Sequence, residues 1–136
     1  MMRVVVDTNV YISALMFGGL PGELLDLAFA GEFMPVTSPV LLDELEEKLR
    51  FKFGVEDADV ERIRGRLERT AEIVSTMPSL AIIRADPDDD RVLECALVGR
   101  ADMIVTGDRH LLKLGAFEGT SIITVRQFMD RIRPAI

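Results

Sequence analysis

Short apolar runs alternate along this chain with segments in which apolar residues recur every three or four positions. Four runs predict buried strands, over Arg3–Val6, Glu32–Val36, Met103–Thr106 and Ser121–Val125. Two further apolar stretches, Ile73–Met77 and Leu80–Ile83, predict at least one more strand. The helical period predicts helices over Asn9–Met16, Glu23–Ala30, Asp57–Thr70 and Gln127–Ile132, and a helical turn over His110–Leu114. The glycine-rich segment Gly18–Gly22 predicts a loop between the first two helices.

Two more helices are indicated by their first residues. Ser38 and Pro39 are a typical N-cap and first helical residue, and apolar positions follow at helical spacing as far as Phe51. Asp86 and Pro87 form the same kind of start, and acidic residues in the next turn favour a helix N-terminus. Strands and helices therefore alternate, with two helices in a row in the middle of the chain. This order favours an α/β fold with a parallel sheet covered on both faces.

Length and composition exclude several classes of protein. A chain of 136 residues is typical of one domain, so we expect residues 1–136 to form a single unit. Hydrophobic residues make up 49%, which excludes a disordered tail, and no apolar run approaches the roughly 18 residues of a membrane helix. We therefore expect no membrane association. Cys95 has no second cysteine to pair with, which favours the cytoplasm, and its helical position predicts a core residue.

The formal net charge is −7, and the sequence pI is about 4.7. Proteins that bind nucleic acid through a broad phosphate-neutralising face are usually basic. Any nucleic-acid partner of this chain must therefore be held by local arginine clusters or by metal ions.

Carboxylates stand where a parallel sheet places its ligands. Asp7 directly follows the first predicted strand, and Asp108 follows the strand Met103–Thr106. Ligands of open parallel sheets bind beyond the carboxyl ends of the strands. Asp88–Asp90 lie at a predicted helix N-terminus, and Glu44 lies about one turn inside another helix. Four separated segments could therefore bring carboxylates to one place.

Each of these acids also has an ordinary structural interpretation. Asp7 could cap the next helix, Asp108 could form a turn with Gly107, and Glu44 could belong to a solvated surface. The acids of the run Asp86–Asp90 could simply complement a helix dipole. Together they favour a shared site, because clustered carboxylates repel unless a cation is bound, and hard divalent cations prefer oxygen ligands. The sequence therefore favours metal-dependent chemistry on a phosphate ester.

Four segments resemble the motifs of the PIN domain family. They are Val4–Val10, Ser38–Leu45, Asp86–Ala96 and Ala101–Asp108, the last followed by Leu111 and Leu112. The similarity spans nearly the whole chain, with the motifs in the family's order and spacing. The resemblance is greatest to the small prokaryotic PIN proteins of the VapC type, which are classed as toxins of toxin–antitoxin pairs. It implies a three-layer, Rossmann-like PIN domain with a central, mostly parallel sheet flanked by helices.

The resemblance also implies the activity of a Mg²⁺- or Mn²⁺-dependent endoribonuclease that hydrolyses single-stranded RNA. Carried over by position, the catalytic acidic quartet would be Asp7, Glu44, Asp90 and Asp108. Asp7 and Asp90 would be the principal metal ligands. Glu44 and Asp108 would hold water around the metal or a second ion.

Asn9 and Thr106 would orient the groups around the metal, again by resemblance. The choice of Asp90 within the third motif rests on its position directly before the helical stretch that begins at Arg91. Asp89 and Asp86 are the substitutes.

The resemblance further implies a homodimer and a cognate antitoxin protein as partners, besides the RNA substrate. Exposed apolar residues weakly support a dimer; the candidates are Phe17, Leu20, Phe51 and Phe53. An antitoxin would insert an arginine into the acidic site, because four carboxylates attract a guanidinium as they attract a metal. The net charge of −7 fits a basic inhibitory segment.

Two other functions remain open from the sequence. Phosphotransfer domains that form an aspartyl phosphate also place an Asp after the first strand, but phosphatases of that kind need a second Asp where this chain has Asn9. A non-catalytic module that binds RNA or protein is the other alternative. The presence of all four acids argues against such a module, because a pure binder has no need to tolerate their repulsion.

Overall fold

The computed structural model of this chain describes residues 1–77 and 87–133. Within those residues a six-stranded sheet forms the centre, with strands β1 (Arg3–Val6), β2 (Met34–Thr37), β3 (Glu72–Ile73), β4 (Met103–Val105), β5 (Ala116–Phe117) and β6 (Thr120–Ile123). The strand order is β3-β2-β1-β4-β6-β5, and each neighbouring pair is parallel except β5 with β6. The mostly parallel sheet expected from the sequence is confirmed.

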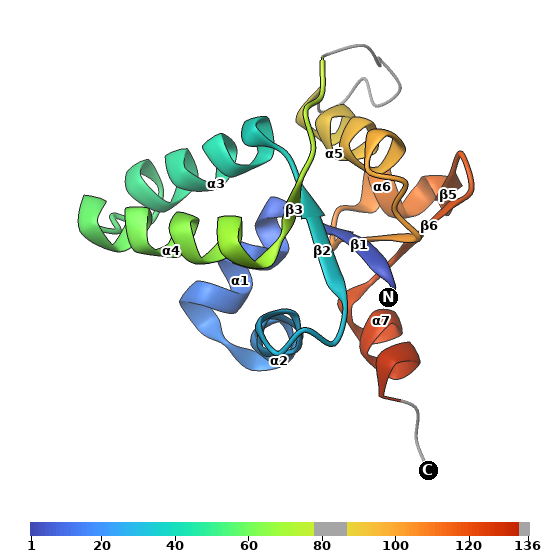
Figure 1. The fold of residues 1–136 in the computed structure, drawn as a ribbon, viewed down its shortest axis with the longest axis horizontal. Helices are drawn as coiled ribbons and strands as arrows, with labels where there is room; N and C mark the ends of the chain where they lie inside the picture. Colours follow the sequence, from blue (N-terminus) through green and yellow to red (C-terminus); the bar gives the residue numbers. More distant parts are fainter. Residues whose placement is uncertain (78–86, 134–136) are drawn as a thin grey trace.

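Helices cover both faces of this sheet. They are α1 (Thr8–Phe17), α2 (Gly19–Phe29), α3 (Pro39–Phe51), α4 (Asp57–Thr70), α5 (Pro87–Val98), α6 (Arg109–Leu114) and α7 (Val125–Ile132). Figure 1 shows α5 and α6 on one side of the sheet and α1, α2 and α7 on the other. Helices α3 and α4 pack against each other and contribute to the core on the α1 side. The three-layer α/β arrangement is therefore present.

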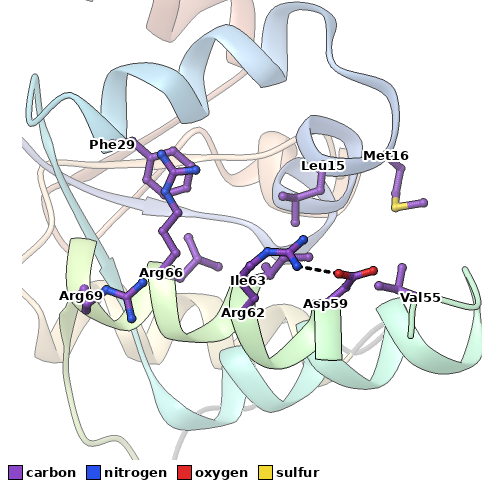
Figure 2. A pocket seen from close by; sticks show the side chains of 10 residues that line it. Leu15, Met16, Phe29, Val55, Asp59, Arg62, Ile63, Arg66 and Arg69 are labelled. Atoms are coloured by element: carbon purple, nitrogen blue, oxygen red, sulfur yellow. Dashed lines mark hydrogen bonds and ion pairs between the residues drawn. The ribbon is translucent and has the colours of Figure 1, made fainter. Parts of the chain in front are cut away.

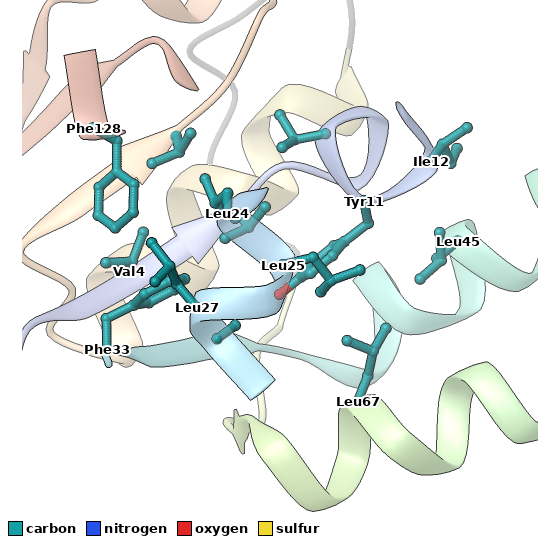
Figure 3. Packing of buried hydrophobic residues seen from close by; sticks show 14 of the residues in the cluster. Val4, Tyr11, Ile12, Leu24, Leu25, Leu27, Phe33, Leu45, Leu67 and Phe128 are labelled. Carbon is teal, nitrogen blue, oxygen red and sulfur yellow. The ribbon is translucent and has the colours of Figure 1, made fainter. Parts of the chain in front are cut away.

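The apolar side chains of strand β1 contribute to the hydrophobic cores on both faces of the sheet. Successive side chains of a strand point to opposite faces, so Val4 and Val6 join the core beneath α1 and α2, whereas Val5 joins the core beneath α5 and α6. All three side chains are buried, as in other parallel strands covered on both faces. Figure 3 shows the larger core, where the rings of Phe33 and Phe128 meet edge to face with centroids 5.0 Å apart.

The sheet changes its direction of growth at β1, because β2 lies on one side of this strand and β4 on the other. In doubly wound sheets, ligands bind at such a switch point, beyond the carboxyl ends of the strands. The backbone N–H of Asp7, just past β1, donates to the carbonyl oxygen of Val105 at 3.0 Å. The ends of β1 and β4 are therefore held side by side.

The predicted loop over Gly18–Gly22 is wrong, because α2 begins at Gly19. Gly18 has a φ of 72° and turns the chain between α1 and α2. Pro21 then lies in the first turn of α2, where its missing N–H removes no helical hydrogen bond. Glycine and proline at this point start a helix instead of interrupting one.

Strand β5 is absent from the sequence-based prediction. It is two residues long, too short to show a period, and Glu118 and Gly119 join it to β6 with φ values of 49° and 83°. Two successive positive φ values are typical of a tight type I′ hairpin turn. Of the stretch Ile73–Met77, only Ile73 belongs to a strand. The stretch Leu80–Ile83 and the predicted N-cap Asp86 lie outside the described residues.

In the part of the chain that the structure describes, no single helix has the length and apolar character needed to cross a membrane. Helices α1 and α2 pass that test only as a pair, and the chain bends by 104° between them.

Candidate active site

Asp7 lies at the carboxyl end of β1 and is buried, with 6% of its surface exposed. Asp7 is the N-cap residue of α1, and its backbone carbonyl accepts hydrogen bonds from Val10 and Tyr11. Its carboxylate accepts a hydrogen bond from the hydroxyl of Thr106, with 2.7 Å between Oγ1 and Oδ2, and another from the backbone of Asn9. Asp7 therefore starts α1, as the capping interpretation predicts, and also joins the segment that follows β4.

Thr106 links the two acids that follow β1 and β4. While its hydroxyl donates to Asp7, the same oxygen accepts from the backbone N–H of Asp108 at 3.0 Å. Asp108 in turn caps α6, because its Oδ1 accepts from the backbone N–H groups of His110 at 2.8 Å and Leu111 at 3.2 Å. Both bonds use one carboxylate oxygen, so capping leaves the other able to bind a further ligand.

Glu44 approaches the same site from α3. This helix begins as predicted, with Ser38 as N-cap accepting a hydrogen bond from the backbone N–H of Leu41. Glu44 Oε1 lies 2.9 Å from the ammonium of Lys48, one helical turn further on, and Glu44 Oε2 lies 3.5 Å from the hydroxyl of Thr8. Glu44 therefore faces α1, not open solvent.

Burial raises the pKa of the Asp7 carboxyl. The hydrogen bonds from Thr106 and from the backbone of Asn9 oppose this rise in pKa, as does the charge of Lys48, whereas the negative charge of Asp108 adds to it. Because Asp108 affects the pKa of Asp7, the two carboxyls are close enough to interact electrostatically.

Burial also raises the pKa of Glu44, and the ion pair with Lys48 opposes the rise. The charges of Asp88 and Asp7 raise this pKa further. Glu44 thus links the acids of β1 with those of α5, and repulsion among carboxylates extends across all three elements. Such repulsion favours the binding of a cation.

The acids of α5 differ in exposure. Asp89 and Asp90 are buried in the first turn of α5, where Asp90 is 2% exposed, whereas Asp88 is exposed. Of this run, it is the charge of Asp88 that raises the pKa of Glu44. The alternative third-motif residue Asp86 lies outside the described residues.

Within residues 1–77 and 87–133, no three His, Cys, Asp or Glu side chains lie close enough together to hold a metal ion. The donors themselves suit a hard divalent cation, because Asp7, Glu44 and Asp108 supply carboxylate oxygens, and burial removes part of the water around Asp7 and Glu44. The ammonium of Lys48 already lies among them. The arrangement is therefore chemically suited to a metal, but more widely spaced than a closed metal site.

Cavities adjoin the acidic residues on two sides. One of about 510 Å³ is lined in part by Asn9, Thr106, Asp108 and Arg126. Another of about 410 Å³ is lined in part by Glu44, Lys48, Lys52 and Asp88. The wall of each cavity thus contains residues of the acidic site. It also contains a basic side chain from outside that site, Arg126 in the first cavity and Lys52 in the second.

A third cavity, of about 570 Å³, lies between α4 and the pair α1 and α2 (Figure 2). Arg66 stacks over the ring of Phe29 there, 3.7 Å from its centroid, and Asp59 pairs with Arg62 at 2.7 Å. Its lining is apolar and mostly basic, with Asp59 as the acidic residue among the residues that line it, and it includes none of the acids of the candidate site.

Cys95 does not provide an alternative nucleophile. It is fully buried, as predicted, and burial raises the pKa of its thiol to about 12. A thiolate at this position is therefore absent at neutral pH.

The sequence-based prediction lacks two residues that the structure places at the site, Thr8 and Lys48, and it names Asp88 only as one of a run of acids. Lys48 follows Glu44 at i+4, a spacing that favours an ion pair on a helix, so a signal was present. Asp88 belongs to the recognised acidic run, but nothing in the sequence favours it over its neighbours. Asn9, expected to orient the groups around the metal, accepts a hydrogen bond from Lys48 at 3.2 Å.

Comparisons with known proteins identify relatives of this chain. A family model described as a PIN domain matches residues 3–110. The chain is 36% identical over 118 residues to the uncharacterized protein MJ1680 of Methanocaldococcus jannaschii, covering 82% of this chain and 74% of that protein.

Solved structures share the fold. PAE2754 from Pyrobaculum aerophilum matches with a TM-score of 0.63 and 16% identity, over 99% of this chain and 91% of that one. VapBC2 from Rickettsia felis, bound to a DNA fragment from the promoter, matches with a TM-score of 0.63 and 14% identity, over 90% of this chain and 98% of that one. At these identities the similarity concerns the fold alone.

Proposed function

The chain belongs to the PIN domain family, and from this premise we propose that it is a metal-dependent endonuclease that hydrolyses phosphodiester bonds of single-stranded RNA. The observation that carries the proposal is the hydrogen-bonded link Asp7–Thr106–Asp108 at the point where the sheet changes direction. It joins the carboxylate of Asp7 to the backbone N–H of Asp108 at the position where this fold class binds ligands.

Asp7, Glu44, Asp90 and Asp108 are the residues that we propose for holding Mg²⁺ or Mn²⁺. An ion bound there would activate water and offset the charge that develops on the phosphate. Thr106 fixes the orientation of the Asp7 carboxylate by donating to Oδ2, which leaves the charge of that carboxylate in place. Asp108 is held by its bonds to the backbone of α6, so its position is fixed before substrate binds.

The cavities on either side of the acidic residues support a polymeric substrate cut at an internal bond. A single strand that crosses the site would place one flanking phosphate near Arg126 and another near Lys52. Local cations of this kind meet the requirement set by the net charge of −7, because a broad phosphate-neutralising face is typical of basic proteins.

Arg126→Met is expected to weaken the binding of a single-stranded oligonucleotide several-fold, because it removes one phosphate contact. The dependence of log K on log salt concentration should become shallower by about 0.7. Fluorescence anisotropy at several salt concentrations measures both quantities. Arg131→Met is the matched control on the same helix, because Arg131 does not line the cavity. An equal loss in both variants would contradict the proposed strand path.

We further propose two protein partners, a second copy of the chain and a cognate antitoxin that makes the nuclease the toxin of a pair. Phe17 supports the dimer, because it is 77% exposed although its ring packs edge to face with that of Phe53, with centroids 6.5 Å apart. The acidic site suits an inserted arginine, and the fold is shared with VapBC2. The single buried Cys95 accords with a cytoplasmic location.

Light scattering, combined with a nuclease assay, tests both proposed partners. The chain alone should have the mass of a dimer at micromolar concentration. After co-expression with the product of the neighbouring gene, it should run as a larger complex with suppressed nuclease activity. A monomer in the first sample removes the dimer, and unsuppressed activity in the second removes the antitoxin.

A further inference from the structure

The acidic site contains a cation of its own, the ammonium of Lys48. Its Nζ lies 2.9 Å from Glu44 Oε1 and 3.2 Å from Asn9 Oδ1. The charges of Asp7 and Asp88 also act on it, so its partners come from α1, α3, α5 and the end of β1. One ammonium therefore interacts with carboxylates from three separate segments.

The contacts of Lys48 differ from those of an ordinary surface ion pair. Its side chain is 30% exposed, and that of Glu44 is 20% exposed, so solvent screens the pair only in part. Lys52, one turn further along α3, lines the same cavity but is exposed and lies over the ring of Phe53, 5.9 Å from its centroid. Only the inner of these two lysines is directed at the acidic residues.

We propose that Lys48 is a tethered cation that holds the acidic site together in the metal-free protein and competes with the divalent ion for it. This inference rests on the proposed function, because it assumes that a metal binds at the proposed set of Asp7, Glu44, Asp90 and Asp108. In the metal-free state the ammonium offsets repulsion that would otherwise separate these carboxylates. When the metal binds, the same positive charge opposes it, and the wider spacing of the acids has to close.

Lys48→Met tests both halves of this inference, because it keeps an unbranched side chain and removes the charge. Without metal, the variant should melt several degrees below the wild type, since the carboxylates lose their counter-charge. Its Mn²⁺ dissociation constant should fall by about tenfold, since the positive charge beside the Glu44 carboxylate is gone. Calorimetric titration with Mn²⁺ and melting curves in EDTA provide these readouts without any activity assay.

Lys52→Met is the matched control, and Lys48→Arg is the charge-preserving variant. Lys52→Met should leave melting and Mn²⁺ affinity near the wild-type values, and Lys48→Arg should keep Mn²⁺ affinity much closer to wild type than Lys48→Met does. Unchanged or weaker Mn²⁺ binding in Lys48→Met, beside normal binding in the wild type, overturns the role of Lys48 and leaves the nuclease proposal intact. If neither the wild type nor Lys48→Met binds Mn²⁺, the metal site itself is contradicted and this inference fails with it.

Discussion

Asp7→Asn is expected to reduce the rate of RNA cleavage by roughly a hundredfold to a thousandfold, the scale on which one preorganised electrostatic contact acts in other enzymes. The substitution preserves the shape and the hydrogen bond from Thr106, and it removes one negative charge from the centre of the site. A steady-state cleavage assay with a labelled single-stranded RNA in Mn²⁺ measures the effect.

Asp26→Asn provides the control, because Asp26 is exposed on α2, outside the cavities that adjoin the acidic site. It should cleave at the wild-type rate. Comparable rates in Asp7→Asn and Asp26→Asn would remove Asp7 from the reaction.

Although Asp7→Asn should slow cleavage, it should not lower the stability of the fold in the absence of metal. Burial raises the pKa of Asp7, so the folded protein binds this proton more tightly than the unfolded chain does. Stability therefore falls as the pH rises through the raised pKa, and the loss is complete above it. In EDTA at neutral pH, Asp7→Asn should be at least as stable as the wild type, because it carries no charge there.

Adding Mn²⁺ should make the wild type more stable than Asp7→Asn. An ion that binds only the folded site stabilises it by about 2.7 kcal/mol at a hundredfold excess over its dissociation constant. The wild type should gain that amount, whereas Asp7→Asn and Asp90→Asn should gain much less. Chemical denaturation in EDTA and in Mn²⁺ measures all three proteins. An equal gain in the wild type and both variants would show that the ion binds elsewhere.

The parts of the site that could be predicted are those fixed by strand ends. Asp7 and Asp108 each follow an apolar run that forms a parallel strand, and the carboxyl ends of parallel strands meet at one edge. The resemblance to the PIN family also implies Thr106 as an orienting residue, and its hydroxyl bonds to both segments. For Asp7 and Asp108, local sequence and topology agree, so the pattern along the chain is sufficient to place them at the strand ends.

The contacts made by α3 and α5 could not be predicted in the same way. Which acid of Asp88–Asp90 acts on Glu44 depends on the rotation of α5 against α3, and helix periodicity does not set that rotation. The place of Lys48 in the site depends on α3 packing against α1, which brings its ammonium to Asn9. Strand β5 could not be predicted for a related reason. It has only two residues, and its position depends on the hairpin turn that joins it to β6.

The most direct test of the central claim is a cleavage assay of the wild-type chain on an end-labelled single-stranded RNA, in Mn²⁺ and in EDTA. We expect internal cleavage products in Mn²⁺ and none in EDTA, with activity restored when the metal is added back. Cleavage that continues unchanged in EDTA would contradict metal-dependent chemistry at the acidic site. Binding of the RNA without any cleavage in Mn²⁺ would leave the chain as a non-catalytic binding module.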